Sequence, residues 1–193
     1  MRERSIDEFE AIFQKASIPV FGVPEVKINR VSAVLKGDAL DASSVSVATY
    51  LRDRFNAEGL LHWTERAERR VAAELAAAHQ LQLCPEPFQS TVDLAEQVVQ
   101  ADPQMLLLPE PADLDFRVVR LDDLVEKVTA PVLILRTVID QPAEMFRRVL
   151  RCLTGNFQTT RNFAYAFKLT EPDGVLELLH TVADTEIADV KDA

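Results

Sequence analysis

The sequence offers few side chains that could act in acid–base, nucleophilic or metal chemistry. Its only histidines are His62, His79 and His180, and its only cysteines are Cys84 and Cys152. A general base needs a nucleophile or a substrate within reach, and the sequence indicates no such group for these histidines. Both cysteines lie in apolar runs, which is typical of buried, reduced thiols, and no CxxC motif or Cys/His cluster could hold a metal. The sequence therefore predicts neither an enzyme nor a metal site.

The composition argues against several classes of binding partner. The 193 residues carry a net charge of −10, and so acidic a surface repels the phosphates of nucleic acids and of anionic lipids. No apolar run approaches the ~20 residues that cross a bilayer, and the charged start of the chain lacks the apolar core of a signal peptide. We therefore expect a cytoplasmic protein that binds neither nucleic acid nor membrane.

The apolar pattern divides the chain into three segments. Residues 1–22 are predicted to form an amphipathic helix, since Ser5 and Glu8 have the spacing of a capping box. Residues 23–140 show alternating strand and helix patterns, which predict a parallel sheet with right-handed crossovers. Residues 141–193 are predicted to hold a partial repeat and an acidic tail. The expected strands of the middle segment are 31–35, 60–63, 81–84, 105–108 and 131–135, and the expected helices are 45–55, 65–80, 91–101 and 121–128.

The partial repeat is defined by a constant offset of 118 residues. The pairs with this offset are Arg30 and Arg148, Gly37 and Gly155, and the histidines of two Leu-Leu-His runs, His62 and His180. We interpret the offset as a tandem duplication. The second copy would supply only the strands Val149–Leu153 and Val175–Thr181 around one helix. Such a fragment must pack on the first domain, pair with another chain or belong to a longer protein, and the sequence leaves these three alternatives open.

The run from Met105 to Leu135 resembles the universal stress protein family. The resemblance rests on an apolar fourth strand, on the helix sequence from Asp123 to Val128, which contains Glu-Lys-Val, and on a following Pro-Val-Leu strand. Leu60-Leu61-His62 is similar to the second strand of that family. The resemblance implies a Rossmann-like (adenine nucleotide alpha hydrolase-like) fold. Its parallel five-stranded sheet would have the order 3-2-1-4-5, with helices on both faces.

The phosphate-binding motif of that family is degenerate here. Its ATP-binding members carry Gly-x2-Gly-x9-Gly-Ser/Thr after the fourth strand, and the matching positions are Pro109, Ala112, Asp122 and Asp123. Glycines allow backbone N–H groups to approach a phosphate, whereas these residues remove a donor and add side chains and negative charge. The family's nucleotide binders also carry an aspartate at the end of the first strand, where this sequence has Lys36 before Gly37. We therefore expect no cofactor, and ATP or AMP only as a weaker alternative.

Three functional hypotheses follow from the resemblance and its altered motif. The leading one is a non-enzymatic regulatory or scaffolding module that does not bind ATP. We expect this module to form a homodimer or a higher homo-oligomer through residues 148–183, or to bind a protein partner. The alternative is a sensor that binds a nucleotide or another small molecule in an altered cleft. An unusual hydrolase is a third hypothesis, against which the absence of a nucleophile–base pair counts.

Overall fold

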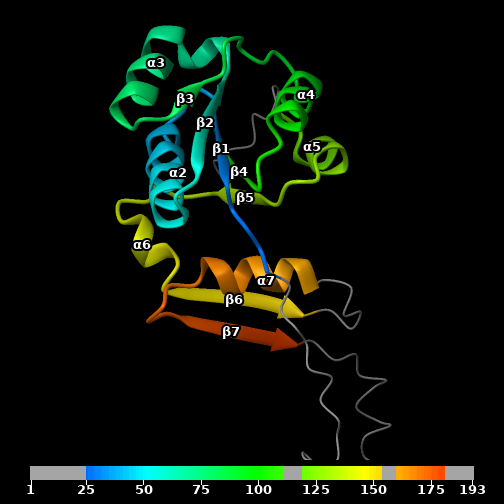
Figure 1. Cartoon of the computed structure of the whole chain (residues 1–193). Coiled ribbons are helices and arrows are strands. Elements are labelled where there is room, and N and C mark those ends of the chain that lie inside the picture. Colours follow the sequence, from blue (N-terminus) through cyan, green and yellow to red (C-terminus); the bar gives the residue numbers. More distant parts are fainter. Residues whose placement is uncertain (1–24, 111–118, 154–159, 181–193) are drawn as a thin grey trace, which may run out of the picture.

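The computed structural model describes residues 25–110, 119–153 and 160–180 (Figure 1). The helix predicted for residues 1–22 lies outside these ranges, and so does the acidic tail. None of the helices described is long and apolar enough to cross a membrane.

The first domain contains a five-stranded parallel sheet in the order β3-β2-β1-β4-β5, which confirms the predicted order. Its strands are β1 (Arg30–Leu35), β2 (Glu58–Trp63), β3 (Gln82–Leu83), β4 (Met105–Pro109) and β5 (Val132–Leu135). The central strand β1 pairs with β2 on one side and with β4 on the other. The order of strands therefore reverses between β1 and β4, and crevices for ligands form at such a point in doubly wound sheets.

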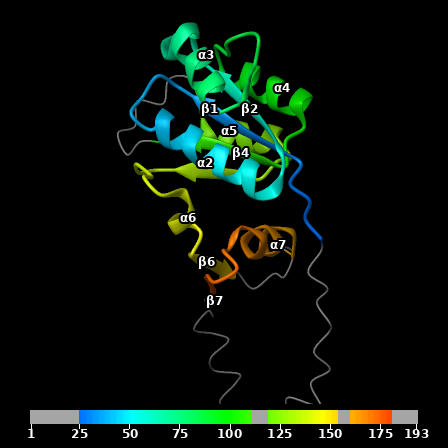
Figure 2. The ribbon, with the colours of Figure 1, turned by 60° about the vertical axis from the view of Figure 1, so that its left-hand side comes forward.

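Helices cover both faces of this sheet (Figures 1 and 2). On one face lie α2 (Asp41–Phe55) and α3 (Arg69–Ala78), and on the other lie α4 (Thr91–Ala101) and α5 (Leu121–Lys127). Because side chains alternate along a strand, β1 supplies both cores. Val31, Ala33 and Leu35 pack with α2 and α3, whereas Val34 packs with α4 and α5.

Of two helices with clear local end signals, one departs from its predicted bounds and the other, α4, has the bounds predicted over 91–101. The helix predicted over 65–80 is a 3-10 turn, η1 (Glu65–Ala67), followed by α3. Glu68 separates them because its φ of 50° lies in the left-handed region, which interrupts a right-handed helix. The start of α4 is fixed by Ser90, whose hydroxyl accepts a hydrogen bond from the Asp93 backbone N–H at 3.1 Å.

The second unit forms a parallel β-α-β arrangement. After α6 (Pro142–Met145), strand β6 (Arg148–Leu153) leads through α7 (Thr160–Leu169) to β7 (Val175–His180), and β6 and β7 make a separate two-stranded sheet. Its register departs from the 118-residue offset. Because Arg30 pairs with Glu58, a strict repeat would pair Arg148 with Leu176, but the structure pairs Arg148 with Val175.

The second unit packs on α2 of the first domain. Tyr50 stacks on Phe146 with ring centroids 6.0 Å apart, and the Tyr50 hydroxyl donates a hydrogen bond to Glu171. Arg54 donates to the Leu169 carbonyl and to Glu171 Oε1, each at 2.7 Å, and to the Thr170 carbonyl at 2.7 Å. This packing is one of the three arrangements that the sequence left open.

Candidate ligand cleft at the carboxyl ends of the strands

A row of polar residues follows the carboxyl ends of four neighbouring strands. Thr64, Lys36, Glu110 and Arg136 directly follow β2, β1, β4 and β5. The strand pairing ends one residue earlier, at Leu35 with Trp63 and at Pro109 with Leu135. Extending these registers by one residue places the four residues side by side, on the face that α4 and α5 cover. The row therefore crosses the β1–β4 switch point, where we place the candidate cleft.

The loop between β1 and α2 uses its backbone donors internally. Asp41 Oδ1 accepts a hydrogen bond from the Lys36 N–H at 2.9 Å, and Asp41 Oδ2 accepts one from the Gly37 N–H at 2.8 Å. Gly37 has a φ of 79°, and a Cβ there would lie 2.6 Å from the Arg66 carbonyl oxygen. Only glycine therefore fits this turn. The turn presents two N–H groups to the carboxylate of the chain's own Asp41.

Lys36 lies among carboxylates at the centre of the row. Its ammonium is 3.7 Å from Asp38 Oδ2, and its side chain is only 13% exposed. Burial lowers the pKa of Lys36, while the negative charges of Asp38, Asp41 and Glu110 act in the opposite direction. Lys36 is therefore surrounded by negative charge that belongs to the protein.

Asp41 is also partly removed from water. Burial raises the pKa of Asp41, and the hydrogen bonds from the Lys36 and Gly37 backbone oppose that rise. The two N–H donors thus replace part of the hydration that the Asp41 carboxylate loses on burial. Two such donors would stabilise a bound anion in the same way.

Glu110 extends the acidic character of the cleft toward β5. The residue is 9% exposed, and its Oε2 accepts a hydrogen bond from Arg136 Nη2 at 3.4 Å. The preceding Pro109 is buried at the end of β4 and has no backbone N–H to offer a ligand. Glu110 and Arg136 were not predicted as site residues, because their proximity depends on strand register. Asp41 was not predicted either, although it lies only four residues after Gly37, and an aspartate at the start of a helix commonly accepts bonds from nearby backbone N–H groups.

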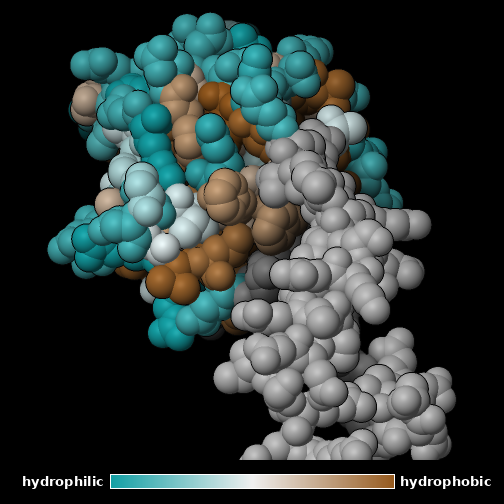
Figure 3. Space-filling model, turned by 60° about the horizontal axis from the view of Figure 1, so that its bottom comes forward, coloured by the Kyte–Doolittle hydropathy of each residue, from teal (hydrophilic) through white to brown (hydrophobic). Residues whose placement is uncertain are grey.

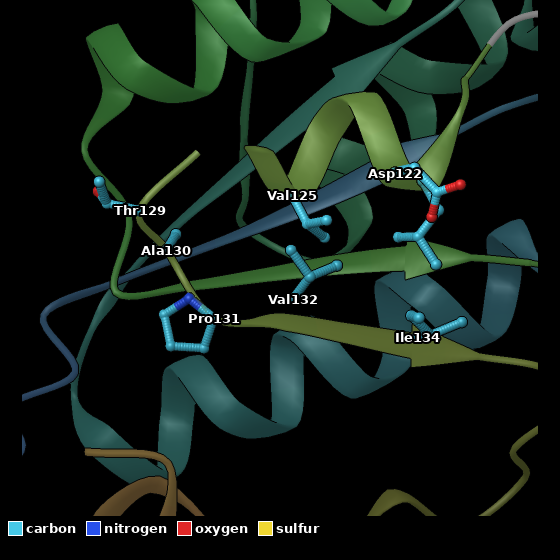
Figure 4. Close-up of a pocket in the computed structure, with 8 residues that line it drawn as sticks. Asp122, Val125, Thr129, Ala130, Pro131, Val132 and Ile134 are labelled. Carbon is cyan, nitrogen blue, oxygen red and sulfur yellow. The ribbon is translucent and has the colours of Figure 1, made fainter. Parts of the chain in front are cut away.

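The remaining predicted cleft residues are placed as follows. Ala112 lies outside the described residues. Asp123 pairs with Arg120 at 3.5 Å in the first turn of α5, where a carboxylate also suits the helix dipole. Asp122 lines a groove of about 360 Å³ between α5 and the outer edge of β5 (Figure 4). The carboxylates that act on the pKa of Lys36 are Asp38, Asp41 and Glu110, and none of them belongs to α5.

A buried polar network lies in the core below the cleft. His62 is fully buried, with Nδ1 3.0 Å from Gln97 Oε1 and Nε2 3.3 Å from Ser32 Oγ. Burial lowers the pKa of His62, and burial raises the pKa of the neighbouring Cys84 thiol to about 11. Both groups are therefore neutral near pH 7, and His62 is a packed part of the core.

One hydroxyl of the row has no partner among the described residues. Thr64 is 3% exposed, and its Oγ1 makes no hydrogen bond in that part of the chain. A buried polar atom without a partner is uncommon in folded proteins. Within the same described ranges, no group of three or more His, Cys, Asp or Glu side chains is placed to hold a metal ion.

Comparisons with known proteins give distant structural neighbours and no sequence match. No protein-family model and no curated protein sequence matches this chain. A solved universal stress protein in complex with cAMP is 13% identical over 58% of this chain and 99% of that chain, with a TM-score of 0.49. A protein from the universal stress protein family from Burkholderia pseudomallei is 10% identical over 59% of this chain and 100% of that chain, with a TM-score of 0.41. The sheet order given above rests on the strand pairing of this chain itself.

Proposed function

We propose that this chain is a non-catalytic regulatory or scaffolding module of the universal stress protein type, which does not use ATP and acts by association with copies of itself or with another protein. The observation that carries the proposal is the position of Asp41. Its carboxylate binds the Lys36 and Gly37 N–H groups at the switch point, which is the place where doubly wound sheets bind their ligands.

Electrostatics in the cleft supports the same proposal. A nucleotide phosphate would have to displace Asp41 and then lie close to Asp38 and Glu110, the carboxylates that surround Lys36. Two like charges 4 Å apart repel by about 1 kcal/mol in water and by about 4 kcal/mol near a protein surface. Lys36 offsets only part of this repulsion, because its ammonium is already near Asp38.

The titratable groups in the described core support a non-catalytic role. A nucleophilic cysteine reacts as the thiolate, whereas the Cys84 pKa of about 11 keeps this thiol protonated. His62 is held between Gln97 and Ser32 and is fully buried, so its ring cannot reach a substrate in the cleft.

Calorimetry with Mg-ATP and with cAMP tests the proposal. We expect no saturable heat from the wild-type protein at ligand concentrations up to about 1 mM, which corresponds to a binding free energy weaker than about −4 kcal/mol. The variant Asp41→Ser should gain measurable affinity, because it frees two N–H donors and removes a charge. Asp93→Ser is the matched control, since Asp93 accepts a similar bond from the Gln89 N–H at 3.1 Å in another helix. A micromolar dissociation constant for the wild type would refute the proposal.

A second candidate function is a small-molecule sensor that uses the altered cleft. The observation that favours it is the buried Thr64 Oγ1, which has no partner among the described residues. Thermal-shift measurements with AMP, ATP and cAMP on the wild type and on Thr64→Val test this candidate. A stabilisation that saturates in the wild type and disappears in the variant would favour the sensor. The absence of any shift would leave the sensor without support from these ligands.

A further inference from the structure

The second unit has one sheet face that is open to solvent. In the β6–β7 register, Arg148 pairs with Val175 and Leu150 with Glu177, so these four residues share a face. Leu150 is 58% and Val175 56% exposed, and the side chains of Arg148 and Glu177 are 76% and 39% exposed. We call these four residues the outer face. In both ribbon views, α7 lies on the opposite side of the sheet, toward the first domain (Figures 1 and 2).

The corresponding face of the first domain is covered. The 118-residue offset relates Leu150 to Ser32, and Ser32 is fully buried in the core beneath α4. Parallel sheets occur almost only with both faces covered, because their strands are apolar on both sides. Among the described residues no element covers the outer face. Figure 3 brings the lower side of the molecule forward and shows brown apolar atoms beside teal polar ones.

The charges on the outer face favour one kind of occupant. Arg148 Nη2 and Glu177 Oε1 lie 2.5 Å apart, so the face carries one positive and one negative charge beside two apolar side chains. A two-fold axis would place Arg148 of one copy near Glu177 of the next, and the reverse, which makes the face self-complementary. A strongly acidic or strongly basic partner would match only one of these charges. The face is locally neutral although the chain carries a net charge of −10.

We propose that a second copy of this chain covers the outer face, so that two β6–β7 sheets pack face to face. Stacked sheets lie about 10 Å apart, which brings Leu150 and Val175 of each copy into one apolar layer with α7 outside it. This inference rests on the proposed function and names its partner and surface. A two-stranded face is small, and interfaces below about 1,200 Å² are typically weak and transient, so association should depend on protein concentration.

Sedimentation velocity over a concentration series tests the surface. The wild-type mass should rise above that of one chain as concentration increases, and Leu150→Asp should weaken the association about tenfold or more, because a carboxylate would enter the apolar layer. The matched control is Val99→Asp on α4, since Val99 is 59% exposed and lies outside the outer face. A wild type that stays at the mass of one chain would overturn the inference, and so would equal effects of the two variants.

A charge-swap experiment tests the pairing between copies. Arg148→Glu makes the outer face wholly acidic, and Glu177→Arg makes it wholly basic. Each variant alone should associate less than the wild type, whereas an equimolar mixture should associate at least as strongly as the wild type. If the pair acts only within one chain, mixing has no effect, and that result would overturn the inference. The calorimetric test of Asp41 does not depend on this outcome, so the two proposals can fail separately.

Discussion

The two β-α-β units of this chain differ in what surrounds them. In the first unit, β1 has a strand on each side and helices on both faces, and Ser32 on one of those faces is fully buried. In the second unit, β6 has one neighbouring strand among the described residues, and Leu150, 118 residues after Ser32, is 58% exposed. The polar residue is therefore inside and the apolar one outside. The comparison indicates that neighbouring layers, and not the polarity of a strand residue, decide its burial.

The largest expected difference between the units lies in how much stability each loses when an apolar side chain is shortened to alanine. Leu107→Ala in β4 should lower the free energy of unfolding by about 2–5 kcal/mol, because Leu107 is fully buried and its truncation leaves a cavity. Leu150→Ala should change it by less than about 0.5 kcal/mol when measured at low protein concentration. Urea denaturation of both variants gives the two values. Similar losses would mean that the units are equally packed.

A smaller effect is expected at the contact between the units. Arg54 is 16% exposed in its side chain and donates to three backbone carbonyls at the end of α7, from Lys168 to Thr170, as well as to Glu171. Arg54→Ala should lower the opening free energy of α7 by about 2 kcal/mol, since hydrogen bonds to charged groups contribute about 1.5–3 kcal/mol. Hydrogen exchange of the α7 amides measures this opening.

The matched control for Arg54 is Arg70→Ala. Arg70 pairs with Glu74 at 3.6 Å, but its side chain is 80% exposed, so its loss should leave the exchange of α7 unchanged. Unaltered hydrogen exchange of the α7 amides in the Arg54 variant would contradict a role for Arg54 in docking the second unit.

The smallest expected effect is a pH dependence of the free energy of unfolding, which arises in the first unit. Burial holds the pKa of His62 below its ordinary value of 6.5, so the unfolded chain binds the proton more readily than the folded one. The contribution of neutral His62 to the free energy of unfolding is therefore present above pH 6.5, and it is lost as the pH drops below that value. The free energy of unfolding should therefore be lower at pH 5.5 than at pH 7.

Urea denaturation of the wild type and of His62→Gln at these two pH values measures the His62 contribution. The variant should lose less stability than the wild type over the same range, because glutamine does not titrate. An equal pH dependence in the two proteins would show that other groups cause it.

Much of the fold could be predicted because it depends on local patterns. The five strands and their order follow from short apolar runs alternating with helices, together with the family resemblance. The pairing of Arg148 with Val175 could not be predicted, since a shift of one residue leaves the apolar run intact while changing which side chains share a face. Glu110 was missed for a related reason, since its proximity to Lys36 depends on where two separate strands end. Asp41 is different, because it lies five residues after Lys36 in the same loop, and there the sequence holds a local signal that was not used.

The helix α2 has a mechanical consequence for the whole chain. Asp41, whose carboxylate binds the Lys36 and Gly37 N–H groups, begins this helix, and Arg54, which contacts the end of α7, lies in its last turn. The two residues are about 20 Å apart at the rise of 1.5 Å per residue. A helix of this length behaves as a stiff rod, so a load applied to the second unit through Arg54 acts on the same element that begins with Asp41. Because α2 is packed against the sheet, the sheet shares that load.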